Sequence, residues 1–506
     1  MFPLFLHRKA NHNSFFYLAL LLFCVWTTIS VRAQDDHSAA AFKQESVVFQ
    51  NNEITLSGNL FLPASGGASP AVVILHGSGP DAGLEYKVYA EAFARAGIAA
   101  LVYDKRGSGK SGGDWQHRQF ALLASDALAA ISFLQQRAEI NPNKVGLWGI
   151  SQGGWAAAYA AARSKDVAFV ISVAGNGVSP TQQEMFHKDE MFKALGYSER
   201  ARDTALKFWK LAFDWMVLVD AGKFYLPKDL MQSERSGASV GLNYDPLPDW
   251  EKITQPVLLI HGTADKLSPH EEAIALITAA LEKNGNRNYA VKIFSNASHT
   301  ITVNKTGLEF DWDANFADGY LATMTDWIWQ QTGQNIQPNS DFQKYDFKPS
   351  PDFADGGRYG KPAWYEQTYP QILAMIVFPL IFLTGAIIWT IGLFGRDKLQ
   401  SKAAARVRFL TGLLSLVNLL LLIGFYVFLA TSVFPQRVGL GQSYSIPLWQ
   451  KVLPLAGIIS LLLTMLLILQ IILARQAITR WQIFIVGSAV VFIAWLFYWN
   501  LIGGLF

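Results

Sequence analysis

Cysteine is nearly absent from this chain: Cys24 is the only one among 506 residues. It lies in an apolar N-terminal stretch that we expect to be removed, so a disulfide, a thiolate nucleophile and a cysteine-ligated metal site are excluded. Charged residues are also scarce, at 16% of the chain compared with about 25% in an average soluble protein, whereas apolar residues make up 51%. We therefore expect part of the chain to lie in lipid.

The few charges are distributed unevenly. Residues 1–33 carry three basic and no acidic side chains, residues 34–370 carry 30 basic and 38 acidic, and residues 371–506 carry nine basic and one acidic. The middle segment is mildly acidic and has no basic stripe, which argues against a nucleic-acid partner. The basic excess of the last segment falls between apolar runs, where membrane topology explains it.

The N-terminus has the pattern of an export signal. Arg8 and Lys9 precede an apolar run over residues 15–26, and residues 31–33 suit cleavage before Gln34. We therefore predict a signal peptide over residues 1–33, with an uncleaved signal anchor as the alternative. Both interpretations place the body that follows outside the cytoplasm.

Four apolar stretches near the C-terminus are each long enough to cross a hydrocarbon core about 30 Å thick. The first connection between them carries five Lys or Arg residues, the second two and the short third two, which places connections one and three in the cytoplasm. We predict a multi-pass membrane protein with an extracytoplasmic body and the lipid bilayer as a partner. The predicted spans are 372–394, 409–429, 452–474 and 483–505.

None of these spans contains Asp, Glu, His, Lys or Arg, which argues against an ion or proton pathway. Their main polar groups are Asn418, Gln470 and Asn500, and we expect these side chains to form hydrogen bonds between helices.

Residues 34–333 alternate short β-branched runs with helical stretches. Runs such as 71–75 and 256–260 are apolar on both faces, as expected for strands of a mostly parallel sheet covered by helices. From about residue 176 to 250 the alternation gives way to a helical, aromatic-rich insertion that we expect to cap the sheet. Residues 334–370 are rich in polar residues, Pro and Gly and predict a linker. The fold class is therefore α/β, followed by a four-span domain over 371–506.

A strand, a sharp turn and a helix are predicted to meet at the G-x-S-x-G sequence of residues 149–153. Such a turn projects the serine oxygen above a sheet, so Ser151 is the predicted nucleophile. A second G-x-S-x-G sequence surrounds Ser111, but no helical run follows it, and we expect a loop serine there. The same stretch imitates a phosphate loop, but such a loop needs glycine at the position of Asp104, so nucleotide binding is excluded.

A serine nucleophile also needs a base and an orienting acid. Asp265 follows the strand predicted to end at residue 260, and His299 follows the strand predicted to end at residue 294. Loops at the carboxyl ends of parallel strands converge, and the chain order Ser, Asp, His is the one known for this arrangement. His270 is a rival base, but it begins a helix and is expected to be solvated.

The glycine-rich segment of residues 76–80 follows an early strand and leaves its backbone N–H groups free to aim at a substrate oxygen. We assign the oxyanion hole to the N–H groups of Gln152 and Ser78. His76 precedes the nucleophile in the chain and lies at a strand end, so we expect it to support this loop. No metal and no organic cofactor is implied.

Residues 45–333 resemble an α/β-hydrolase of the bacterial serine esterase and peptidase-like kind, with HGSGP, YDKRGSGKS, GISQGG, HGTAD and the final SH in that family's order and spacing. The resemblance implies Ser151 as nucleophile, His299 as base, Asp265 as orienting acid and residues 176–250 as a cap. It also implies an ester, thioester or amide of a small-molecule or lipid-like acyl group as substrate. The spans lie outside the resemblance, and a catalytically vestigial sensor coupled to them is the alternative.

Overall fold

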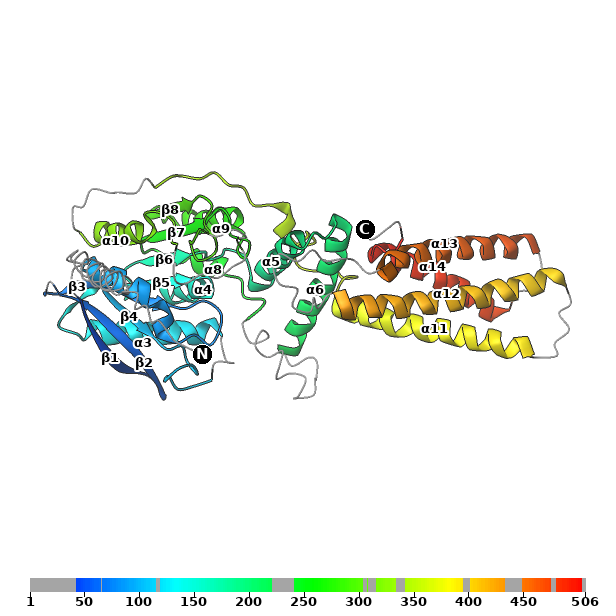
Figure 1. Ribbon diagram of the computed structural model, residues 1–506, viewed down its shortest axis with the longest axis horizontal. Coiled ribbons are helices and arrows are strands. Elements are labelled where there is room, and N and C mark those ends of the chain that lie inside the picture. Colours follow the sequence, from blue (N-terminus) through cyan, green and yellow to red (C-terminus); the bar gives the residue numbers. More distant parts are fainter. Residues whose placement is uncertain are drawn as a thin grey trace, which may run out of the picture.

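The structure is a computed structural model, and it describes residues 42–64, 66–114, 119–220, 241–303, 307, 315–333, 342–394, 401–432, 448–474 and 479–502. In this part of the chain, an eight-stranded sheet and four long helices lie at opposite ends of an elongated molecule (Figure 1). The predicted signal peptide lies outside the described residues.

The sheet has the strand order β1-β2-β4-β3-β5-β6-β7-β8. The strand β2 (Ile54–Pro63) pairs antiparallel with both β1 (Phe42–Asn51) and β4 (Ala99–Tyr103). From β4 onward the neighbours are parallel, which confirms the predicted mostly parallel sheet. The edge strand β1 was not predicted, because its sequence is polar and only partly buried. The parallel strands after β4 are β3 (Ser69–Leu75), β5 (Ile140–Ile150), β6 (Val170–Val173), β7 (Val257–Gly262) and β8 (Tyr289–Phe294).

Helices cover both faces of this sheet. Consecutive side chains of the central strands point to opposite faces, so Val73 joins one apolar cluster and Ile74 the other, and both are fully buried. This burial on two sides explains why the strands read as continuous apolar runs. One face is covered by α3 (Phe120–Gln135), α4 (Gln152–Ala161), α8 (Leu247–Trp250) and α9 (His270–Lys283), and the other by α2 (Lys87–Arg95) and α10 (Tyr320–Gln331).

The cap predicted over residues 176–250 is a helical insertion between β6 and β7. It contains α5 (Pro180–Ala194) and α6 (Glu199–Asp220), which lie between the sheet and the four long helices (Figure 1). Ser179 caps the start of α5 with a capping box. Its hydroxyl accepts from the N–H of Gln182, and the side-chain oxygen of Gln182 accepts from the N–H of Ser179. Met185 and Phe213 are buried between the two helices, so part of the aromatic-rich sequence forms the cap's own core.

The four long helices form a bundle, and each is long and apolar enough to cross a membrane. Asn418 accepts a hydrogen bond from Ser460 on the next helix, as predicted. The prediction for Asn500 was wrong: the last helix ends before it, and its side chain donates to Asp203 of the cap. The bundle helices are α11 (Thr368–Phe394), α12 (Lys402–Ser432), α13 (Leu448–Ala474) and α14 (Arg480–Tyr498).

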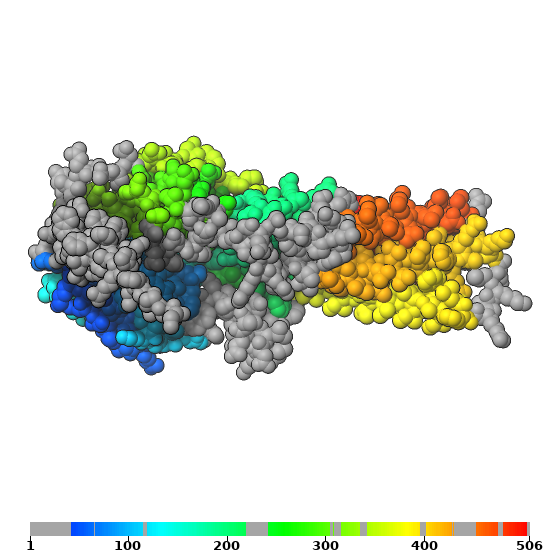
Figure 2. Space-filling view, viewed as in Figure 1, coloured from blue at the N-terminus to red at the C-terminus, as the bar shows by residue number. Residues whose placement is uncertain are grey.

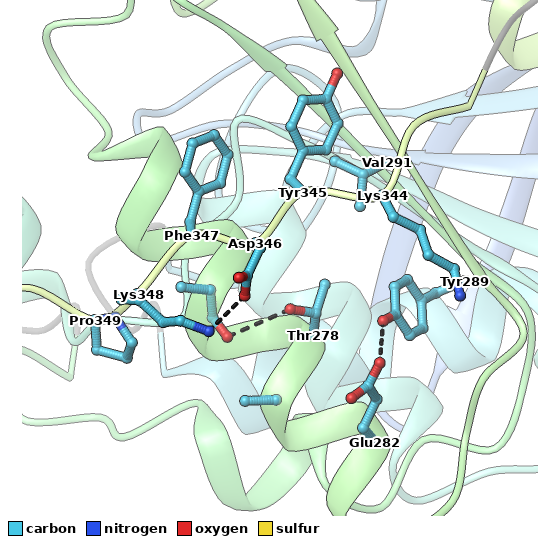
Figure 3. A pocket seen from close by; sticks show the side chains of 12 residues that line it. Thr278, Glu282, Tyr289, Val291, Lys344, Tyr345, Asp346, Phe347, Lys348 and Pro349 are labelled. Atoms are coloured by element: carbon cyan, nitrogen blue, oxygen red, sulfur yellow. Dashed lines mark hydrogen bonds and ion pairs between the residues drawn. The ribbon is translucent and has the colours of Figure 1, made fainter.

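Residues 342–367, here called the strap, lie between the sheet-containing body and the bundle, and their packing differs from the free linker that the composition predicted. Tyr345 and Phe347 pack against the core of the sheet, and the backbone N–H of Ser350 donates to Glu272 of α9 at 2.6 Å. The strap crosses α9 and β8 and covers a pocket of about 430 Å³ (Figure 3). The polar composition of this segment gave no indication of these contacts, because only a few aromatic side chains hold the strap on the body.

Candidate active site

Ser151 lies between the last residue of β5 and the first residue of α4, with φ 53° and ψ −115°. A positive φ is strained for a residue with a side chain. The Ser151 N–H donates to the carbonyl of Val173 at 2.9 Å, which helps to hold the turn. A Cβ atom at Gly149 would lie 2.2 Å from the carbonyl oxygen of Gly153, so this position requires glycine.

Ser111, in the second G-x-S-x-G sequence, has a different setting. Its hydroxyl donates to the carbonyl of Asp104 at 2.6 Å and accepts from the N–H of Ser57 at 3.0 Å. The side chain is buried, and its hydroxyl acts as both donor and acceptor in holding the loop against β2. This agrees with a structural role for Ser111.

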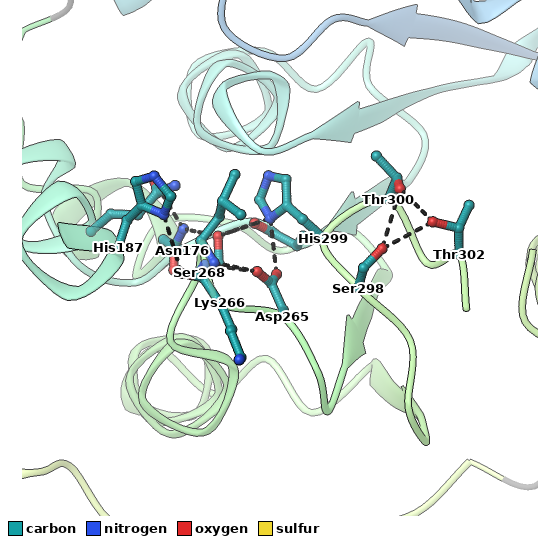
Figure 4. A network of polar contacts seen from close by, with 12 residues as sticks. Asn176, His187, Asp265, Lys266, Ser268, Ser298, His299, Thr300 and Thr302 are labelled. Atoms are coloured by element: carbon teal, nitrogen blue, oxygen red, sulfur yellow. Dashed lines mark hydrogen bonds and ion pairs between the residues drawn. The ribbon is translucent and has the colours of Figure 1, made fainter. Parts of the chain in front are cut away.

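Asp265 and His299 lie in the loops after β7 and β8, where the sequence predicted them, and they are paired (Figure 4). The distance from Asp265 Oδ2 to His299 Nδ1 is 2.9 Å, and both side chains are almost completely buried. The other carboxylate oxygen accepts from the N–H groups of Leu267 and Ser268 at 2.8 and 2.9 Å. Burial alone would raise the pKa of Asp265, but His299 and these hydrogen bonds hold it below its usual range.

Further polar residues around His299 were not predicted. Ser268 Oγ lies 3.4 Å from His299 Nδ1 and accepts from Asn176 Nδ2 at 3.0 Å. The Asn176 amide also donates to Gln183 of the cap helix α5 at 3.1 Å. His187 of α5 lies at the Asn176 end of this network (Figure 4). Its Nδ1 is 3.3 Å from the carbonyl oxygen of Lys266. No motif marks these residues, because the fold brings them together from separate loops.

Lys105 connects the two segments that were predicted to form the oxyanion hole. Its Nζ donates to the carbonyls of Gly77 and Gly79 at 2.6 and 3.1 Å and to Gln152 Oε1 at 2.7 Å. The Gly77 carbonyl shares a planar peptide group with the Ser78 N–H, so holding one fixes the direction of the other. Lys105 is only 3% exposed, and the signal for it in the sequence is a lysine two residues after the end of the apolar strand β4.

Three other histidines in the described part of the body, His76, His261 and His270, lie in settings that differ from that of His299. Burial, together with the charge of Lys105, lowers the pKa of His76 to about 3, and the ring packs edge-on against Tyr86 and Tyr103. Burial likewise lowers the pKa of His261 to about 3. His270 begins α9 as predicted, but it is half-buried near Phe347 of the strap rather than solvated.

Comparisons with known proteins find a family match within the part of the chain that forms the sheet. Residues 128–304 match the family model of the C-terminal region of BAAT / acyl-CoA thioester hydrolases. The quorum-quenching protein AidA of Acinetobacter baumannii is 36% identical over 129 residues, which are 25% of this chain and 42% of AidA.

The esterase EstD of Thermotoga maritima is 27% identical over 267 residues, which are 50% of this chain and 60% of EstD. This chain therefore matches less than two thirds of the length of either relative. The α/β hydrolase GrgF from Penicillium sp. sh18 superimposes with a TM-score of 0.39 at 21% identity, over 57% of this chain and 99% of GrgF.

Proposed function

We propose that this chain, whose body belongs to the esterase-like α/β-hydrolase family, hydrolyses a carboxylic ester or thioester through an acyl-enzyme on Ser151. The observation that carries the proposal is the buried Asp265–His299 pair at the same sheet edge as the strained Ser151 turn. An ester or thioester is favoured because the family model and EstD are named for these activities.

In the first half of the reaction, Ser151 Oγ attacks the carbonyl carbon and His299 Nε2 takes the serine proton. Asp265 accepts from His299 Nδ1, which fixes the tautomer with a free Nε2 and stabilises the imidazolium that forms. The pKa of Asp265 stays below its usual range, so the carboxylate is ionised at neutral pH. The protonated His299 then gives its proton to the departing alcohol or thiol.

The negative charge of the tetrahedral intermediate is placed at the N–H groups of Gln152 and Ser78. Lys105 acts as a positioning residue for both, because it holds the Gly77 carbonyl and the Gln152 side chain. In the second half, His299 takes a proton from water as the water oxygen attacks the acyl carbon, and it then gives this proton to Ser151 Oγ as the carboxylic acid departs.

The four bundle helices would anchor the enzyme in a membrane. The export signal and the five-charge first connection support a hydrolase body on the extracytoplasmic side. Protease added to intact spheroplasts should then remove the body, whereas a cytoplasmic body would be protected and would overturn this placement.

The activity is tested with the purified full chain and a panel of p-nitrophenyl esters, acyl thioesters and aminoacyl anilides. We expect turnover of esters or thioesters that is lost in Ser151→Ala and retained in Ser111→Ala. Turnover of the anilides alone would contradict the proposed substrate class, and turnover that survives Ser151→Ala would contradict the proposed nucleophile.

A further inference from the structure

The cap helix α6 is seated on the end of the membrane bundle. Leu211 of α6 is buried in the same apolar cluster as Phe425 and Trp499 of the bundle, and Phe208 and Trp209 pack against that cluster. The space-filling view shows cap atoms meeting bundle atoms (Figure 2). The apolar surface of α6 is therefore divided between the core of the cap and the bundle.

Charged side chains on the same face of α6 form hydrogen bonds with the terminal residues of two bundle helices. The first residue of α11, Thr368, donates its N–H to Asp214 Oδ2 at 2.9 Å and its hydroxyl at 2.7 Å. The last residue of α14, Tyr498, accepts at its carbonyl from Lys207 Nζ at 2.6 Å. A helix start has unpaired N–H groups and favours a carboxylate, whereas a helix end has unpaired carbonyls and favours an ammonium.

The spacing of these residues shows that the contact is built into α6. Positions 207, 211 and 214 are four and three residues apart, which places them on one face of a helix. One turn before them, Asp203 and Thr204 accept from the side chain of Asn500 at 2.8 and 3.0 Å. One continuous stripe of α6 thus contacts the bundle with an apolar centre and polar ends.

A buried carboxylate joins this docked helix to the rest of the cap. Asp189 of α5 is 2% exposed at its side chain and lies 2.6 Å from Arg202 of α6. It also contacts Arg358 of the strap at 3.1 Å and accepts from the Tyr359 hydroxyl at 2.8 Å. The helix α5, which carries Gln183 and His187 to the His299 network, is therefore fixed to α6 and the strap.

The length of α11 and the exposed aromatic residues near its start indicate where a bilayer surface would lie. The helix α11 has 27 residues, so at about 1.5 Å per residue it is longer than a hydrocarbon core about 30 Å thick. Near its start, Trp364 is 74% exposed and Tyr369 is 53% exposed. Exposed Trp and Tyr beside the end of a span mark the membrane–water interface. Because α6 contacts this same end, the cap would lie at the headgroup level of a bilayer that the bundle crosses.

We propose that the bundle supports the cap from the membrane side. The edge of the sheet that carries Ser151 and His299 would then be accessible from the bilayer surface. The preferred substrate is then an amphiphilic ester or thioester whose acyl chain lies in the bilayer, because the enzyme is held where such a molecule is concentrated. This inference rests on the proposed hydrolase function and goes beyond it, since it assigns the substrate class and gives the bundle a role in substrate access.

The test uses the full chain in phosphatidylcholine and phosphatidylglycerol vesicles and two esters of one fluorophore. Methylumbelliferyl acetate is soluble in water, whereas methylumbelliferyl palmitate lies in the vesicle. The double variant Lys207→Ala, Asp214→Ala removes both helix-end contacts, and Glu199→Ala removes an exposed charge of the same helix as a matched control. We expect the palmitate-to-acetate activity ratio to fall by about tenfold or more in the double variant and to stay at the wild-type value in the control.

The contact itself is tested separately with the paired variant Asp203→Cys, Asn500→Cys, which should form a disulfide in membranes, whereas Glu199→Cys, Asn500→Cys should not. Failure of the first pair to cross-link, an unchanged ratio in the double variant, or an equal loss of both activities would overturn the inference. Absence of acetate hydrolysis by the wild type, together with no labelling of Ser151, would instead refute the proposed function.

Discussion

Replacing Lys105 by methionine keeps an unbranched side chain in a buried position and removes one positive charge. Standard peptide dimensions and the 2.6 Å contact to the Gly77 carbonyl place the ammonium about 7 Å from an oxyanion bound at the Ser78 N–H. At an effective dielectric constant of about 20, two opposite unit charges at that distance attract by about 2.4 kcal/mol. Since the oxyanion exists only in the intermediate and its transition states, we expect kcat to fall by about fiftyfold with little change in KM.

The assay is steady-state hydrolysis of p-nitrophenyl butyrate by detergent-solubilised enzyme at neutral pH. Lys110→Met is the matched control, because Lys110 is an exposed lysine near the same loop. A Lys105→Met enzyme that is folded by circular dichroism and keeps kcat within about twofold of the wild type would refute the electrostatic reasoning. A rise in KM alone would show that Lys105 serves substrate binding instead.

Three further predictions concern the site, the buried histidines and the strap. Asp265→Asn should lower kcat by about 10⁴-fold by favouring the wrong His299 tautomer, and a loss below tenfold in the ester assay would contradict this role. The pKa of His261 is about 3 when folded and about 6.5 when unfolded, so the unfolded state binds the extra proton and stability falls as pH drops below about 6.5. The cost is about 1.4 kcal/mol per pH unit, and a His261→Met variant should lose less thermal stability between pH 6.5 and 4.5 than the wild type; equal losses would argue against a neutral buried ring. Replacing Tyr345 and Phe347 by serine should lower the melting temperature of the body by about 5 °C, whereas an unchanged value would mean that the strap is a free linker.

The sheet could be predicted because its strands are buried on both faces, which leaves an unbroken apolar run in the sequence. The edge strand β1 has water on one side and a polar sequence, so the same criterion failed there. The candidate site was predictable for a related reason. Ser151, Asp265 and His299 lie one, three and five residues after the ends of β5, β7 and β8, and the carboxyl ends of parallel strands meet.

The parts that were missed depend on contacts between distant segments. Lys105 is recognisable only when the loops of Gly77 and Gln152 are brought to the same place. The strap was read as a linker because composition reports polarity but not where single aromatic side chains pack. The last span was extended too far because Asn500 was treated as a polar group inside lipid, whereas it turns out of the helix toward the cap.

The central claim is that Ser151 is the nucleophile of a working hydrolase, and covalent labelling tests it most directly. The purified full chain is treated with a fluorophosphonate probe, and the modified residue is identified by mass spectrometry of the digested protein. We predict a single adduct on Ser151 that disappears in Ser151→Ala, persists in Ser111→Ala and forms far more slowly in a His299→Gln variant. An adduct on Ser111, or the absence of any adduct on the folded wild-type protein, would contradict the account.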